Sequence, residues 1–171
     1  MNFAGAVTLT GNPITLTTDY GSLPQINQNS GSAVVINAPL NLDVSTVLGG
    51  TGSGLVDISH VISGPWQGLT INSPGTWRLS GNNTYSGATC VKTGTLSCSQ
   101  AASLGSSALS ISNGAVVDLN YSGTRTISAL ILSGTNMPAG VYGSPRSSAT
   151  CKDSHFSGTG TVTVPSSKAK Q

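Results

Sequence analysis

Short apolar segments recur along the chain, and within each of them apolar and polar residues alternate. The segments 75–79, 94–98 and 114–119 show the pattern most clearly, with Gly, Asn or Ser close to their ends. A period of two is typical of a β-strand that buries one face. We therefore expect small polar residues on the outer face, and on the inner face the side chains of Trp77, Leu79, Leu96, Cys98, Val117 and Leu119.

The strands repeat along the chain at a step of about 20 residues. Residues 69–71 align with 89–91, 109–111 and 129–131, and the first series of segments keeps the same step. Strands this short cannot form a stable hairpin stack, whereas a coil that returns at every step stacks each strand on its equivalent, about 4.8 Å away. The pattern predicts an all-β fold, a parallel β-helix (β-solenoid), and the crossover rule favours its right-handed form. About eight coils of this length fit in the chain.

The organisation of the remaining chain follows from the same pattern. Residues 1–60 follow it less regularly, with expected strands at 14–17, 34–36, 40–42 and 55–58. The last strand is expected at 161–164, ahead of a polar tail formed by residues 165–171. We expect one β-solenoid domain over residues 1–164, in which 61–164 is the clear repeat region.

Composition supports β-structure and argues against other classes. Charged residues make up 7% and aromatic residues 5% of the 171 residues, and all five acids are Asp. No segment has a sustained helical period, so helix is expected in less than about one tenth of the chain. A net charge of +2, with seven scattered Lys and Arg, disfavours a nucleic-acid partner.

We expect no targeting segment at the start of the sequence. Its first residues lack a basic region and a long apolar run, so we do not expect them to form a signal peptide. No apolar stretch approaches the ~20 residues that a membrane span requires. We expect either an exported chain whose signal has been removed or a segment of a longer precursor.

Catalysis by a polysaccharide-cleaving β-helix needs carboxylates clustered on adjacent coils. The sequence contains no Glu, and nothing acidic stands one step before or after Asp118. We expect no catalytic residue among the acids, which lie far apart at Asp19, Asp43, Asp57, Asp118 and Asp153.

Two short segments carry groups that could act together. Asp57 and His60 stand three residues apart, but no G-x-S-x-G elbow accompanies them, so we expect a turn after a strand and no catalytic triad. Cys151, Asp153 and His155 would share one face of an extended strand and could bind a metal ion. A fourth ligand is missing nearby, so we expect no metal site and no cofactor.

Aromatic rings on the surface would suggest sugar binding. Tyr85 and Tyr121 are expected in turns, where they could stack on a sugar, whereas Trp77 points inward by its phase and Trp66 stands alone. The Asn pair at 82–83 is expected to end a strand, because Asn tolerates the left-handed turn conformation and can form ladders with its neighbours.

The repeat region also resembles a known family. Residues 77–91 read WRLSGNNTYSGATCV, and GTL at 94–96 and LGS at 104–106 follow. This run is similar to the autotransporter-associated β-strand repeat, written LxLSGxNTYxGxTxVxxGTL. The segments 137–143 and 155–164 are similar to the closing part of such bacterial surface proteins. The resemblance covers residues 61–164 and implies an exported β-solenoid, usually a passenger or stalk, with no catalytic residue in the repeat.

The three cysteines leave room for one internal disulfide, and the spacing does not select the pair. Two of them depart from the family pattern, since Cys90 and Cys98 stand where Thr and an aliphatic residue are usual. Cys98 has the inward phase and is expected in the core, while Cys90 has the outward phase. If a disulfide forms in this exported context, we expect it between Cys90 and Cys151.

Together these observations favour a non-enzymatic extracellular structural protein at the bacterial cell surface. Its expected partners are a second copy, stacked head to tail into filaments, or neighbouring repeats of a longer surface protein. A carbohydrate-binding adhesin and a polysaccharide-active β-helix enzyme remain the alternatives. The sequence does not name a ligand.

Overall fold

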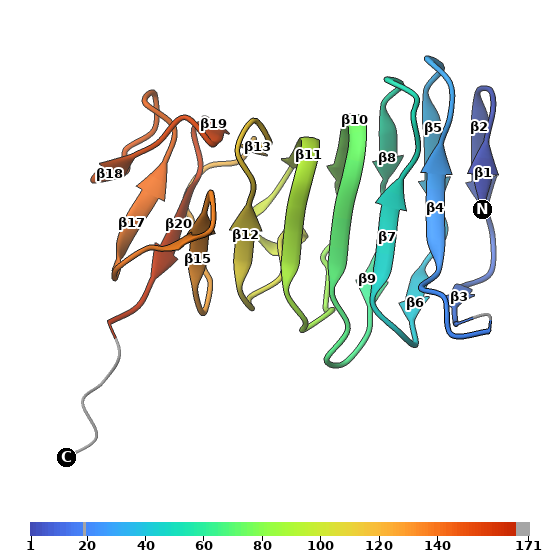
Figure 1. Cartoon of the computed structure of the whole chain (residues 1–171), viewed down its shortest axis with the longest axis horizontal. Helices are drawn as coiled ribbons and strands as arrows, with labels where there is room; N and C mark the ends of the chain where they lie inside the picture. Colours follow the sequence, from blue (N-terminus) through green and yellow to red (C-terminus); the bar gives the residue numbers. More distant parts are fainter. Residues whose placement is uncertain (19, 167–171) are drawn as a thin grey trace.

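The alternating segments form strands that stack into columns along one axis. The computed structural model describes residues 1–18 and 20–166 and shows an elongated stack of coils with the N-terminus at one end (Figure 1). The first column contains β1 (Asn2–Phe3), β4 (Gln25–Gln28), β7 (Thr46–Gly49), the first parts of β10 (Leu69–Leu79) and β11 (Thr89–Cys98), β12 (Leu109–Ile111) and β15 (Leu130–Leu132).

The second column lies beside the first, and a third column completes the early coils. The second contains β2 (Val7–Thr10), β5 (Val34–Asn37), β8 (Val56–Ile58), the last parts of β10 and β11, β13 (Val116–Leu119) and β19 (Phe156–Gly158). The third column contains β3 (Ile14–Leu16), β6 (Leu40–Leu42) and β9 (Ile62–Ser63). Strands β3 and β6 confirm the expected strands at 14–17 and 40–42, whereas β9 is an addition to the two series of strands that the repeat predicts.

Neighbouring strands within these columns run parallel, which confirms the parallel β-solenoid. Leu69 pairs with Thr89, and Thr89 pairs with Leu109, as the predicted step requires. Leu109 then pairs with Leu130 and not with Ala129, because this coil is one residue longer. The second series also holds its predicted register, from β10 through β11 to β13.

The structure holds fewer coils than the eight expected. Seven strands stack in parallel in the first column, which gives six steps from coil to coil. The early coils are longer than predicted, since Asn2 pairs with Asn27 and Val7 with Val34. From Ser133 onward much of the chain builds a different structure at the end of the stack.

The core runs through the middle of the stack, and the predicted phase of the strands is correct. The six residues expected to point inward are each 1% exposed or less. Among their neighbours on the outward face of the sheet, Arg78 and Asp118 are half-buried and Ser97 is buried. The only helical segment of the described chain is one short 3-10 turn, η1 (Ala101–Ser103), so the expectation of very little helix is confirmed.

The C-terminal end departs from a purely parallel arrangement. Ser133 and Gly134 have left-handed φ values of 48° and 83°, and they form a two-residue hairpin turn that leads into β16 (Thr135–Asn136), antiparallel to β15. Strand β17 (Gly140–Gly143) pairs antiparallel with β20 (Thr161–Val164) and parallel with β18 (Cys151–Lys152). These strands, with β14 (Thr124–Thr126), cover this end of the stack (Figure 1).

Two further expectations concern the ends and the membrane. The last strand, predicted at 161–164, is β20, whereas residues 167–171 of the expected tail lie outside the described residues. Across the described ranges, no helix has the length and apolar character needed to cross a membrane.

Candidate functional site

A polar column of outward side chains follows the second column of strands. Arg78 stands opposite Asp57 in the neighbouring coil, and its Nη2 lies 2.7 Å from Oδ2 of that carboxylate. The other carboxylate oxygen accepts a hydrogen bond from Ser80 Oγ at 2.8 Å. The hydrogen bond with Asp57 raises the pKa of Arg78 above its ordinary value. The ion pair between Arg78 and Asp57 joins two coils.

Asp118 lies further along the same column and makes a similar link. It accepts hydrogen bonds from Ser97 Oγ and Ser157 Oγ, both at 2.9 Å. These serines occupy the coils on either side, and neither neighbouring position carries an acid. Arg78 and Ser97 separate Asp57 from Asp118 in the column, so these two carboxylates do not form the adjacent pair that a glycosidase requires.

The structure forms no hydrogen bond between Asp57 and His60, the candidate acid and histidine near the start of the repeat region. His60 is exposed, and its Nδ1 accepts a hydrogen bond from the backbone N–H of Val61 at 2.9 Å. Asp57 is engaged by Arg78. The segment is therefore a turn after a strand, as expected, and Asp19 lies outside the described residues.

Two of the three expected metal-ligand candidates do come together near the C-terminus. His155 Nδ1 lies 2.6 Å from Asp153 Oδ1, which also accepts a hydrogen bond from the backbone N–H of His155 at 2.8 Å. The other ring nitrogen, Nε2, lies 2.9 Å from Ser133 Oγ. Cys151 is not part of this cluster, and the described residues contain no group of three metal-binding side chains.

The order Ser133, His155, Asp153 matches the order of groups in a catalytic triad. Here, however, the serine is exposed at the tip of the two-residue hairpin turn, without the enclosure from water that acyl transfer benefits from. The hydrogen bonds fasten the turn between β15 and β16 to the segment that precedes β19.

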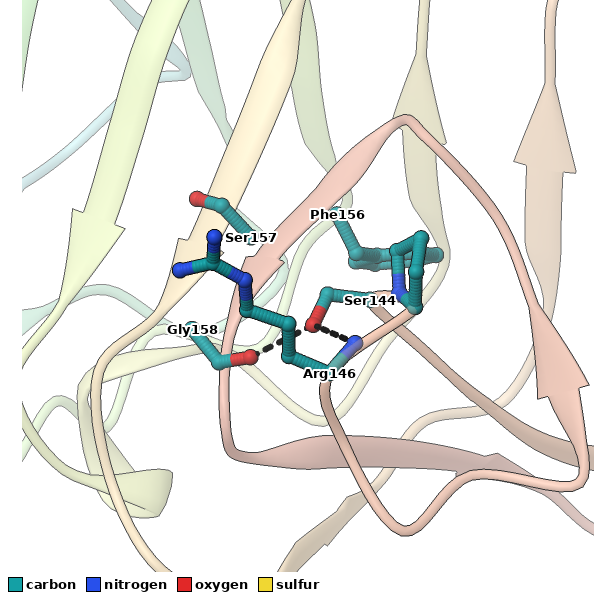
Figure 2. A pocket seen from close by; sticks show the side chains of 6 residues that line it. Ser144, Arg146, Phe156, Ser157 and Gly158 are labelled. Atoms are coloured by element: carbon teal, nitrogen blue, oxygen red, sulfur yellow. Dashed lines mark hydrogen bonds between the residues drawn. The ribbon is translucent and has the colours of Figure 1, made fainter.

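A hollow of about 240 Å³ lies at the C-terminal end of the stack. Ser144 Oγ donates a hydrogen bond to the carbonyl of Gly158 at 2.6 Å and accepts one from the backbone N–H of Arg146 at 3.2 Å (Figure 2). One cation and no acid line the hollow, so it offers no carboxylate for acid or base catalysis. The lining residues are Ser144, Pro145, Arg146, Phe156, Ser157 and Gly158.

The two tyrosines expected on the surface are buried, so the expectation that they could stack on sugars is wrong. Tyr85 is 2% and Tyr121 is 8% exposed. The hydroxyl of Tyr85 is hydrogen-bonded to Thr89 Oγ1 at 2.8 Å and accepts a bond from the N–H of Gly105 at 3.1 Å. Tyr121 donates to the carbonyl of Thr161 at 3.0 Å. Burial raises the pKa of Tyr85 to about 12. Both rings pack in the core, where each hydroxyl has a hydrogen-bond partner.

The exposed aromatic rings are at other positions. Trp66 is 86% exposed and Tyr20 is fully exposed, and both have left-handed φ values, 66° and 47°. Trp66 lies in the loop between β9 and β10, and Tyr20 in the loop between β3 and β4. Sequence reasoning set Trp66 aside as isolated and did not consider Tyr20. Their common position becomes apparent only when the third column of strands is known.

Asn83 links three coils and is not a simple strand terminator. Its Oδ1 accepts a hydrogen bond from the N–H of Ile62 at 2.8 Å, and its Nδ2 donates to the carbonyl of Ser103 at 2.7 Å. Asn82 beside it is exposed, and neither Asn lies in a strand. In place of the expected ladder between Asn side chains, the Asn83 side chain forms hydrogen bonds with the backbone of Ile62 and Ser103.

All three cysteines are free thiols, so Cys90 and Cys151, the pair favoured in case a disulfide forms, are not bonded to each other. Cys98 lies in the core as expected. Burial raises the pKa of its thiol to about 12, which keeps it protonated and unreactive at neutral pH.

Comparisons with known proteins agree with the stacked coils. Residues 69–97, which include β10 and nearly all of β11, match the passenger-associated-transport-repeat. The chain is 34% identical over 172 residues to the adhesin BmaC autotransporter of Brucella suis biovar 1 (strain 1330). That alignment covers 96% of this chain and 4% of the relative. No solved structure matches the chain significantly. The resemblance to the autotransporter-associated β-strand repeat is confirmed by the first two findings.

Proposed function

Because residues 69–97 match the passenger-associated-transport-repeat, we propose that the chain is part of an exported bacterial passenger and works at the cell surface or outside the cell. The match falls on the two long strands in the middle of the stack, where two columns meet. The similarity to an adhesin autotransporter extends over nearly the whole chain and supports the same placement.

The role that the geometry supports best is a non-enzymatic, structural one. The observation that carries it is the continuous parallel ladder of the first column, from β1 to β15. Side-chain links reinforce it between coils, through the Arg78–Asp57 ion pair and through Asn83. A rod held together along its axis can display other parts of a surface protein at a distance from the cell.

The open end of the stack is the proposed place for a partner. Strands β1, β2 and β3 each pair with a strand on one side within the described chain. The half-buried residues Val7, Leu9 and Ile14 pack against the core at this end. We propose that neighbouring repeats of a longer surface protein stack here, since the chain spans about 4% of the length of the relative it matches. Head-to-tail stacking of copies into a filament is the second candidate, and the antiparallel strands that cover the opposite end make it less favourable.

Surface display can be tested by fusing the chain ahead of an autotransporter translocation domain in a Gram-negative host. We expect a protease added to intact cells to remove the chain, while the fusion stays protected when the translocation domain is inactivated. Retention of the intact chain inside the cell with an active translocation domain would contradict the proposal.

The structural role and the choice of partner need the purified chain. Electron microscopy and sedimentation at high protein concentration distinguish single particles from filaments. Particles that stay single support stacking on repeats of the same polypeptide, and long fibres support head-to-tail assembly. Cleavage of a polysaccharide by the purified chain would contradict the non-enzymatic role.

A further inference from the structure

Large apolar side chains are exposed in two loops on one edge of the solenoid. Apart from Met1, the large exposed hydrophobic residues of the described chain are Tyr20, Leu23 and Trp66. The first two lie in the loop 17–24 between β3 and β4, and the third in the loop 64–68 between β9 and β10. Both loops connect the third column to the first, so they lie along the same edge (Figure 1).

We propose that Tyr20 and Trp66 form a binding platform for a chain of uncharged sugars. We call these two residues the aromatic edge. This inference rests on the proposed function only in taking the chain to be exposed to its surroundings. It gives the alternative function, a carbohydrate-binding adhesin, a specific binding surface and a class of ligand.

Both residues of the aromatic edge have a left-handed backbone conformation. Tyr20 and Trp66 are two of only three non-glycine residues with a left-handed φ in the described chain. The third, Ser133, is explained by its hairpin turn. A left-handed conformation is unfavourable for a bulky side chain and persists when its surroundings enforce it. Such strain is concentrated at functional sites, and here it coincides with the two most exposed aromatic rings.

Hydrogen bonds from both neighbouring coils hold the loop of Trp66 in place. The N–H of Trp66 donates to Ser86 Oγ at 2.8 Å, in the next coil. The N–H of Gly68 donates to Ser45 Oγ at 3.0 Å, in the preceding coil. The N–H of Gln67 donates to the carbonyl of Gly64 at 3.3 Å. The indole is therefore presented on a fixed loop, and binding loses little conformational entropy.

The loops that carry the two rings lie two steps of the ladder apart. Their loops lead into β4 and β10, which are separated in the first column by β7 alone. Two steps of the ladder place equivalent positions on the order of 10 Å apart, a distance that two consecutive sugar rings of an extended chain can span. The loop between them, residues 43–45, carries no aromatic side chain that would divide the edge.

The chemistry of the edge favours uncharged sugars over other ligands. Aromatic faces pack against the apolar C–H face of a sugar ring. The polar side chains that fasten the loop of Trp66 are Ser45, Gln67 and Ser86, all uncharged, and they can pair with hydroxyl groups. The loops 43–45 and 64–68 contain no Lys or Arg to attract an acidic polysaccharide, and Asp43 would repel one.

The test is affinity electrophoresis of the full 171-residue chain through gels that contain a neutral polysaccharide, such as laminarin, hydroxyethyl cellulose or yeast mannan. Heparin serves as the anionic comparison. We expect at least one neutral polysaccharide to retard the chain, and Trp66→Ala to weaken that binding about tenfold. Tyr20→Ala should weaken it less, and the double variant should abolish it. Leu23→Ala, which removes an exposed apolar side chain without a ring, is the matched control and should bind normally.

A further variant separates binding from folding. Trp66→Asn removes the ring but tolerates the left-handed backbone, so it should lose binding while its Tm stays equal to or above that of the wild type. Trp66→Phe keeps a ring and should retain most of the affinity. Absence of retardation in every neutral polysaccharide, binding to heparin alone, or unchanged binding by Trp66→Ala would each overturn the proposal. Since all measurements use purified protein, these outcomes are independent of the surface-display experiment.

Discussion

The side-chain oxygen of Asn83 accepts a hydrogen bond from the backbone N–H of Ile62, 2.8 Å away in the preceding coil. The amide nitrogen of the same side chain donates to the carbonyl of Ser103 in the following coil at 2.7 Å. Asn83 is 7% exposed, so these backbone groups have little access to water. Asn83 itself lies outside the strands, and its side chain thus links the coils in place of strand pairing.

Asn83→Ala should therefore be costly. It leaves one buried N–H and one buried carbonyl without their partner, at an expected loss of about 2–4 kcal/mol in the free energy of unfolding. Asn82→Ala, at the exposed neighbour, should change stability by less than about 0.5 kcal/mol. Urea unfolding followed by circular dichroism measures both, and a similar loss for the two variants would refute the bridging role.

Truncation of core residues should depend on strand phase. Leu96→Ala or Leu119→Ala is expected to cost about 2–5 kcal/mol, because each leaves a cavity in the packed interior. Thr95→Ala, on the outward face of β11, should cost well under about 1 kcal/mol. Chemical unfolding of the three variants checks this prediction, and equal effects at all three sites would disagree with the observed phase.

The register shift between β10 and β11 coincides with a glycine of β11. Gly94 has a φ of +72°, and a Cβ there would collide with the carbonyl oxygens of Ser73 and Gly75. Gly94→Ala should cost more than about 2 kcal/mol, since steric overlap adds to backbone strain. Gly114 has a φ of +80° but open space around it, so Gly114→Ala should cost only about 1 kcal/mol. The difference in urea midpoint between the variants isolates the packing effect.

Stability should fall in alkaline solution. Burial raises the pKa of Cys98 and of Tyr85 to about 12, above the ordinary values of about 8.5 and 10. Between about pH 9 and pH 12 the unfolded chain therefore binds fewer protons than the folded chain, and stability decreases as pH rises. Urea midpoints measured from pH 7 to pH 11 should show this decline, and Cys98→Ala should delay its onset toward pH 10. A flat profile for the wild type would contradict the burial of these groups in solution.

Sequence periodicity predicted the coils where the repeats are short and regular. Trp77, Leu96 and Val117 lie in the expected register because the alternation and the repeat step agree there. In the third column, β3 and β6 lie where strands were expected, at 14–17 and 40–42, but the same reasoning missed β9, which has only two residues, and did not place these strands in a column of their own. It also overestimated the number of coils, because loop lengths between strands are not encoded in the alternation.

The surface chemistry was harder to predict than the fold. Tyr85 and Tyr121 lie in segments rich in turn residues, which suggested exposure, but their hydroxyls find buried partners far along the chain, the N–H of Gly105 and the carbonyl of Thr161. The ion pair between Asp57 and Arg78 depends on a pairing across one whole coil. Contacts of this kind follow from the register and cannot be read from neighbouring residues in the sequence.

The antiparallel end of the solenoid has a consequence for the order of folding. Leu132 pairs with Thr135, and Tyr142 pairs with Cys151, so these contacts close much shorter loops than any coil-to-coil pairing. Short loops lose less entropy on closure, so we expect these two turns to form early. The pairings of β13 with β19 and of β14 with β20 close longer loops than any coil-to-coil pairing does. We therefore expect the cover as a whole to close last, over coils that are already stacked, which pulse-labelled hydrogen exchange would detect as late protection of β14, β19 and β20.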